Sequence, residues 1–279
     1  EREEVMNEKE TQVELVFSKQ PKFMQAITDS LLMIKRSSTH IIRNTDQLLG
    51  TFFQPIMFLV LFTAVFNAVG LALPKDISYL DFLMAGIIVQ TVAFGSTTTS
   101  IAVANDLQRG IVDRFKSLPM SNVAVLNGHV ISDVFRNGIS TTVMLLTGLL
   151  FGFRPDASIS DWMLIIGILV LFTLAFSWLS AIMGVLAKSV EGVQWMSFLI
   201  VFPLTFASGA FAPTDSLAEW IRPFAENQPI THVIEAVRGL MIGTPIDDHG
   251  WLAIVWSLAI LVVSIPVATW LFKKKTIKV

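Results

Sequence analysis

Long stretches without a charged residue are the feature that most restricts the fold of this chain. A helix that crosses the roughly 30 Å hydrocarbon layer of a membrane needs about 20 mostly apolar residues. Six stretches lack Asp, Glu, Lys and Arg over comparable lengths: 47–74, 82–105, 137–153, 162–187, 192–218 and 251–272. They are continuously apolar rather than alternating, which favours helices over the strands of a barrel. We therefore predict an all-α integral membrane protein with six spans: 52–73, 80–104, 132–153, 162–187, 195–212 and 251–272.

Composition supports this class and excludes others. Of the 279 residues, 53% are hydrophobic and 15% are charged, whereas soluble domains carry about 25% charged residues. A net charge of −2 provides no basic surface for a nucleic acid. The absence of cysteine excludes disulfides, thiolate metal sites and thiol nucleophiles in this sequence. The first 20 residues are acidic rather than apolar, so we expect no signal peptide, and the first span would direct insertion.

Lysine and arginine are unevenly divided between the two sides of the predicted membrane domain. With the N-terminus inside, 16 of the 20 Lys and Arg residues lie on the cytoplasmic side. Cytoplasmic loops of membrane proteins carry this excess. We therefore predict a multi-pass protein of the cell membrane with both termini in the cytoplasm.

Three segments are expected to differ from the six-span domain, which we place at 51–279. Residues 1–20 are predicted to form a mobile cytoplasmic tail. Residues 21–50 carry apolar side chains at helical spacing, which indicates an amphipathic helix in the inner interface, or else a lead-in helix packed on the bundle. Residues 213–250, between spans five and six, are predicted to contain two short amphipathic helices at the outer interface.

The cytoplasmic segment after the second span combines charged and apolar faces. Asp106 and Arg109 are three residues apart, as are Asp113 and Lys116, and Pro119 would end the helix. From spacing alone, this segment is equally consistent with a docking helix for a partner and with a solvated charged loop.

Several catalytic patterns are missing from the sequence. It contains no G-x-x-x-x-G-K-[ST] loop for nucleotide phosphates, no H-E-x-x-H and no G-x-S-x-G, so we predict no catalytic residue and no metal site. We expect Asp133 and Arg136 in the first turns of the third span, which leaves no charge at mid-membrane. If the chain moves a solute uphill, the energy would then come from another subunit. The alternatives are a self-sufficient channel or ion-coupled carrier and, with less support, an intramembrane enzyme or scaffold.

Phenylalanines recur every fourth residue in two predicted spans. They are Phe58, Phe62 and Phe66 in the first span and Phe198, Phe202 and Phe206 in the fifth. The second span is rich in hydroxyl groups between Thr91 and Ser100. Such stripes fit contact with lipid or core packing, and hydroxyls fit hydrogen bonds between helices. Both also fit the wall of a route for an amphipathic cargo.

The order of these features resembles that of type-2 ABC export permeases, in particular the daunorubicin-resistance permease group. The likeness extends from about residue 20 over nearly the whole chain. In the first cytoplasmic loop and the third span, the matching residues are Gly110, Arg114, Leu118, Pro119, Asp133 and Arg136. In the outer segment they are Ser208, Gly209, Phe211, Pro213, Gln228, Pro229, Arg238 and Gly239. The family pattern has a glutamate before the glycine that corresponds to Gly110. In this chain Asp106 replaces that glutamate, or the glutamate is missing.

The resemblance implies the transmembrane subunit of an ATP-driven exporter of drugs, lipids or glycolipids. Its partners would be two copies of an ABC ATPase subunit, which bind ATP and Mg, together with a second permease, identical or related, and membrane lipid. The coupling residues would be Asp106, Arg109, Gly110, Asp113, Arg114, Phe115, Lys116, Leu118 and Pro119. The translocation path would include Phe58, Phe62, Phe66, Gln90, Phe94, Thr97, Phe198, Phe202, Phe206 and Ser208. An outer gate would involve Phe211, Pro213, Glu235 and Arg238, the last two as a latch or as a purely structural pair.

Overall fold

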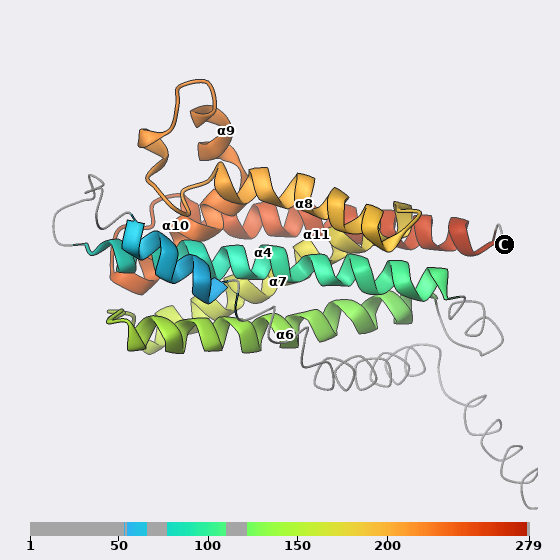
Figure 1. The fold of residues 1–279 in the computed structure, drawn as a ribbon, viewed down its shortest axis with the longest axis horizontal. Coiled ribbons are helices and arrows are strands. Elements are labelled where there is room, and N and C mark those ends of the chain that lie inside the picture. The colour runs from blue at the N-terminus through green and yellow to red at the C-terminus, as the bar shows by residue number, and fades with distance from the viewer. Residues whose placement is uncertain (1–52, 54, 66–76, 110–121, 278–279) are drawn as a thin grey trace, which may run out of the picture.

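The chain folds into a bundle of long helices. The computed structural model describes residues 53, 55–65, 77–109 and 122–277, and within them the regular elements are helices and none is a strand. The long helices run side by side, α9 projects from one end of the bundle, and the C-terminus lies at the other (Figure 1). After the helix Pro55–Val65 come α4 Tyr79–Gln108, α6 Asn122–Leu150, α7 Ile159–Leu186, α8 Val190–Phe206, the 3-10 turn η1 Thr214–Ser216, α9 Arg222–Asn227, α10 Pro229–Ile242 and α11 His249–Ile277.

Three of these helices, α4, α7 and α11, are long and apolar enough to cross a membrane. This confirms a membrane protein of helical class. The helix Pro55–Val65 and α8 are apolar but shorter, so the count of six spans stays a prediction. The predicted tail, the predicted interfacial helix at 21–50, Phe66 and most of the predicted coupling loop lie outside the described residues.

Among the helices from α4 on, two boundaries differ from those predicted by more than five residues. Helix α6 begins at Asn122 rather than near 132. Its first turns belong to the bundle because Leu126 and Val130 pack with Trp178 of α7 and Phe272 of α11 in one buried cluster. Helix α8 ends at Phe206 rather than near 212.

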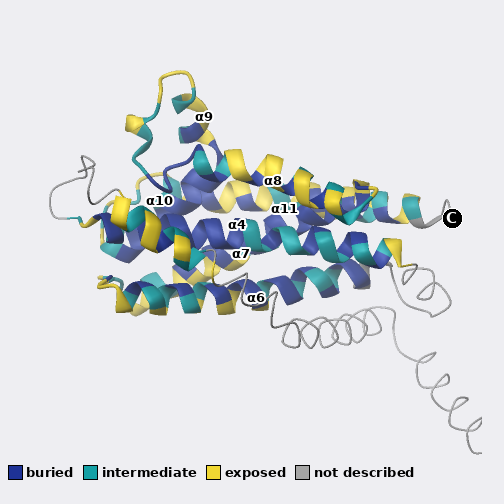
Figure 2. Cartoon of the chain, viewed as in Figure 1, coloured by how far each residue is buried: buried dark blue, intermediate teal, exposed yellow. Residues whose placement is uncertain are grey.

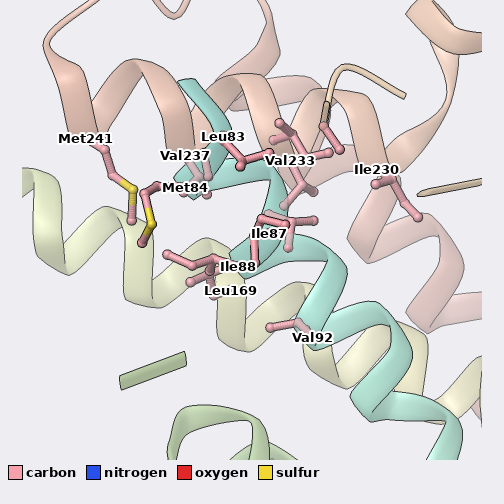
Figure 3. Packing of buried hydrophobic residues seen from close by; sticks show 14 of the residues in the cluster. Leu83, Met84, Ile87, Ile88, Val92, Leu169, Ile230, Val233, Val237 and Met241 are labelled. Atoms are coloured by element: carbon pink, nitrogen blue, oxygen red, sulfur yellow. The ribbon is translucent and has the colours of Figure 1, made fainter. Parts of the chain in front are cut away.

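Helix α4 occupies the centre of the bundle. It packs against α6, α7, α8 and α10, and Figure 2 shows it among the most buried of the long helices. Its apolar side chains form the main core with those of α7 and α10 (Figure 3). In that view, Leu83 and Ile87 of α4 lie close to Val233 of α10.

Helix α10 is a core helix, although its short amphipathic sequence predicted an interfacial position. Val233, Ile234 and Val237 are fully buried. Pro229 begins the helix, where the missing N–H costs nothing, and Gly243 ends it with a left-handed φ of 69°. Because α10 packs against α4, α7 and α11, it closes one end of the bundle.

Two glycines let a helix and a turn approach α4 closely. A Cβ atom added at Gly184 of α7 would overlap the carbonyl oxygen of Ser100, and one added at Gly86 would overlap that of Ala210. Small residues at such crossings allow the backbone contact on which helix packing in membranes depends.

We predict that Gly184→Ala lowers the melting temperature of the purified protein by several degrees, because α7 must move away from Ser100 of α4. The matched control is Gly167→Ala on the same helix, where an added Cβ meets nothing within 4 Å. Alanine is the better helix former by about 1 kcal/mol, so the control should melt at the same temperature or higher. Equal melting of the two variants would contradict this packing.

Candidate functional site

A pocket of about 250 Å³ lies between the helix Pro55–Val65, α4 and α8. Its lining residues are Phe58, Phe94, Thr97, Ile101, Gln194, Ser197, Phe198, Phe202 and Phe206. Phenylalanine rings form most of the wall, while two hydroxyls and one amide supply polar groups. No lining residue carries a charge. The pocket therefore suits an apolar molecule with a few polar atoms.

The aromatic wall continues as a ladder of rings beyond the pocket. Ring centroids are 4.8 Å apart between Phe198 and Phe202, 4.2 Å between Phe202 and Phe206, and 4.8 Å between Phe206 and Phe211. Phe211 in turn stacks on Phe62 at 4.4 Å. Residues four apart lie on the same face of a helix, which is why the three phenylalanines of α8 form a continuous row.

The structure brings together six of the residues predicted for the translocation path: Phe58, Phe94, Thr97, Phe198, Phe202 and Phe206 line one pocket. Of the other four, Phe66 lies outside the described residues and three lie away from the pocket. Phe62 stacks on Phe211 beyond the pocket, Gln90 is buried in the core, and Ser208 belongs to the turn after α8.

Sequence reasoning missed three lining residues, Ile101, Gln194 and Ser197. The spacing of Gln194, Ser197 and Phe198 on one face of the fifth span was the available signal.

Side chains from other elements satisfy the carbonyl groups where α8 ends. The amide nitrogen of Gln228 donates to the carbonyl oxygens of Leu204 at 2.6 Å and Ala207 at 3.0 Å. The Tyr79 hydroxyl donates to the carbonyl of Phe211 at 2.9 Å. The last carbonyls of a helix lack partners within it, so the two bonds from Gln228 stabilise the end of α8, and the bond from Tyr79 holds the segment that follows.

Arg238, predicted for an outer gate, is a buried anchor. It donates to the carbonyls of Phe82 at 3.1 Å and Gly209 at 2.6 Å, and it pairs with Glu235. Its guanidinium also lies 3.7 Å from the centroid of the Phe82 ring. One side chain of α10 thus holds both α4 and the segment after α8, an arrangement that fits the structural reading of the Glu235–Arg238 pair.

A second, wider pocket of about 880 Å³ opens at the α9 end. Pro213, also predicted for the gate, lines it together with the carboxylates of Asp215, Glu226 and Glu235. Two of these carboxylates are paired with Arg222, because Asp215 and Glu226 both accept from its guanidinium. Phe211 stands two residues before Pro213 in the chain, so the ring ladder ends close to a lining residue of this pocket.

An ion pair lies in the interior of α6, whereas both of its residues were predicted in the first turns of the third span. Asp133 and Arg136 pair with each other, with 1% and 6% of their surfaces exposed. Because α6 begins at Asn122, Asp133 lies about 16 Å along a helix of 29 residues rather than in its first turns. The pair is neutral overall and is bonded to α4 and α7, which makes its burial tolerable.

Only two of the predicted coupling residues can be placed. Asp106 is largely buried near the end of α4, and its carboxylate lies 2.9 Å from Nε2 of His129. Arg109 follows as the C-cap of α4. Gly110, Asp113, Arg114, Phe115, Lys116, Leu118 and Pro119 lie outside the described residues. Among the residues that the structure describes, no three His, Asp or Glu side chains converge as a metal site would require.

Comparison with known proteins decides the family. Residues 28–242 match the family described as ABC-2 type transporter. The chain belongs to this family. It is 30% identical over 229 residues to the daunorubicin resistance ABC transporter permease protein DrrB1 of Streptomyces coeruleorubidus, covering 82% of this chain and 80% of that one. It is 26% identical over 246 residues to the probable doxorubicin resistance ABC transporter permease protein DrrC of Mycobacterium tuberculosis, covering 87% of each.

The inner membrane transport permease YadH of Escherichia coli is also similar. It is 24% identical over 226 residues, covering 79% of this chain and 86% of the relative. The family is the transmembrane component of ABC systems, which is consistent with the apolar helices and places this permease in a membrane.

A histidine pair joins α10 to α11 beside the wider pocket. The Nδ1 atoms of His232 and His249 are 2.9 Å apart, so one ring donates and the other accepts. Burial, and then the charge of His249, lower the pKa of His232 below its usual 6.5.

We predict that acidification destabilises the permease through this pair. Below about pH 6.5 the unfolded chain protonates His232 before the folded protein does, so stability is lost as the pH falls through this window. Melting temperatures of the purified protein between pH 7.5 and 5.0 should fall. In His249→Asn, which removes the neighbouring charge, they should fall less steeply. Identical slopes for the two proteins would contradict the assignment.

Proposed function

We propose that this permease is the transmembrane subunit of an ATP-driven ABC exporter, that it moves a hydrophobic or amphipathic cargo outward, and that a separate ATPase subunit powers it. The observation that carries the proposal is the pocket between the helix Pro55–Val65, α4 and α8, in a chain of the ABC-2 family. Its walls are apolar, and its few polar atoms are uncharged.

The chemistry of the pocket favours cargo of low polarity. A charged solute would lose its water there without gaining a partner, whereas an aromatic or lipid chain would gain contacts with several rings. Two relatives carry daunorubicin and doxorubicin resistance in their names, so hydrophobic drugs are the first class to test. Lipids and glycolipids share the same physical character.

A second permease would complete the site. Drug-sized pockets usually enclose about 300–1,000 Å³, more than the 250 Å³ found in one chain. Beside the pocket, Trp195 and Leu199 of α8 are 73% and 74% exposed. We propose that this face meets a second permease copy, identical or related, and that two copies of the ABC ATPase bind ATP and Mg below them.

The direction of transport and the coupling to the ATPase follow from the proposed topology. The α9 end faces outward, and the C-terminal end faces the cytoplasm, where Lys273, Lys274 and Lys275 gather. The segment from Asp106 to Pro119 contacts the ATPase there. When the ATPase pair closes, this segment moves α4 relative to α8 and changes the width of the pocket between them.

Reconstitution tests whether the permease forms the transport route while a separate subunit hydrolyses ATP. Liposomes with the permease alone should neither hydrolyse ATP nor accumulate daunorubicin or a fluorescent short-chain phospholipid. Adding an ABC ATPase subunit that co-purifies with the permease should produce ATP-dependent movement of at least one of the two. Movement without the ATPase would instead indicate a self-sufficient channel or carrier, and movement of neither cargo with it would contradict the proposed cargo class.

A pocket-filling variant tests the route. Ser197→Trp places an indole in a space of about 250 Å³ and should lower transport by the reconstituted complex at least tenfold. The matched control is Val262→Trp on α11, whose side chain is 68% exposed and lies outside the pocket wall. The control should retain full transport, measured as initial rate per assembled complex. Full transport by Ser197→Trp would remove the pocket from the route.

A further inference from the structure

The middle of α4 is held by hydroxyl groups as well as by its own backbone. In the turn Gly95–Ser100, each of four hydroxyls donates to a carbonyl three or four residues earlier. These bonds are Ser96 to Val92 at 2.8 Å, Thr97 to Phe94 at 2.7 Å, Thr98 to Gly95 at 2.8 Å and Ser100 to Thr97 at 2.5 Å. Hydroxyls bonded back in this way compete with the helix ladder and favour bending. This segment of α4 is therefore one that can bend, and its Thr97 lines the pocket.

The buried ion pair of α6 reaches this turn directly. Arg136 donates to the carbonyl oxygen of Gly95 at 2.6 Å. Asp133, its partner, accepts from Thr98 at 3.3 Å through one oxygen and from Ser177 of α7 through the other. Two side chains of α6 thus tie the turn of α4 to both α6 and α7.

The same turn is linked to α8 on its other side. The hydroxyls of Ser100 and Ser197 are 3.1 Å apart, and Ser197 lines the pocket together with Thr97. A displacement of the turn would therefore change the distance between the two helices that form the pocket wall.

Some polar groups at this junction are left unmatched. Nε of Arg136 and both amide atoms of Asn137 are buried without a hydrogen-bond partner among the described residues. The amide oxygen of Asn137 also occupies the space that a Cβ at Gly95 would need. Buried groups of this kind cost free energy, so a shift of α4 that gave them partners would recover part of that cost.

We propose that Asp133 and Arg136 are positioning residues for transport, which set the place of the turn Gly95–Ser100 and with it the width of the pocket. The inference rests on the proposed function and adds to it how the site is held. Neither residue contacts the cargo. Both act through the carbonyl of Gly95 and the hydroxyl of Thr98, and the turn moves when their hold on α4 changes.

The cysteine-free sequence allows a direct test. In Thr97→Cys, the single thiol reports the exposure of the pocket through its rate of alkylation by N-ethylmaleimide, measured on the full chain in membrane vesicles. The rate is compared with that in the same chain carrying Asp133→Asn and Arg136→Gln, which removes both charges and so leaves neither buried without its partner. The matched control is Thr269→Cys on α11, also a back-bonded threonine.

The double variant should assemble and melt within a few degrees of the parent. Alkylation of the thiol at 97 should change at least threefold, while the thiol at 269 reacts as before. In a reconstituted complex, transport should fall at least tenfold while ATP hydrolysis continues. An unchanged thiol rate and unchanged transport would overturn the proposal, as would equal changes at both thiols, which mean general loosening.

Exchanging the two residues distinguishes a positioning role from a role in stabilising α6 alone. Asp133→Arg with Arg136→Asp keeps an i,i+3 pair on α6 but places a carboxylate beside the carbonyl of Gly95. The positioning role predicts no recovery of transport, whereas a purely structural pair predicts recovery. The parent complex could fail to transport either cargo while the double variant still changes the alkylation rate at position 97 alone. That result would refute the proposed function but support the role of Asp133 and Arg136 in positioning α4.

Discussion

The interior of a membrane offers almost no hydrogen-bond partners, so the polar groups of α4 must find theirs within the protein. This constraint governs the arrangement of the described helices. Hydroxyls of α4 bond to its own backbone, Arg136 of α6 and Arg238 of α10 each bind one of its carbonyls, and Ser197 of α8 lies beside Ser100. The helices that surround α4 supply these partners, while Gly86 and Gly184 mark where backbones approach most closely.

The apolar runs predicted α4, α7 and α11 to within a few residues, because the length needed to cross a membrane can be read from the sequence alone. Helix α6 was predicted to begin near 132 because its charges looked like the edge of a span. In the structure, partners on α4 and α7 satisfy Asp133 and Arg136, so the helix continues past them. Such partners are distant in the chain, and no local pattern reveals them.

The candidate site was likewise predictable only in part. Fourfold spacing placed the phenylalanines of α8 on one face, and the structure sets them along a pocket. The contributions of Gln194 and Ser197 depend on how α8 crosses α4, and the end of α8 depends on Gln228, twenty-two residues beyond Phe206. Together these features describe an uncharged, aromatic-walled pocket, and we propose that the ion pair behind it sets its width.

In the proposed exporter, cargo occupies the pocket between α4 and α8 while a separate subunit supplies the energy. Photolabelling measures this most directly. A photoreactive azide derivative of daunorubicin is activated in the reconstituted complex, and the labelled peptides are identified by mass spectrometry. The account predicts labels concentrated in residues 94–101 and 194–206, reduced by excess unlabelled drug. Labels confined to the lipid-exposed surface of α11 and insensitive to unlabelled drug would contradict it.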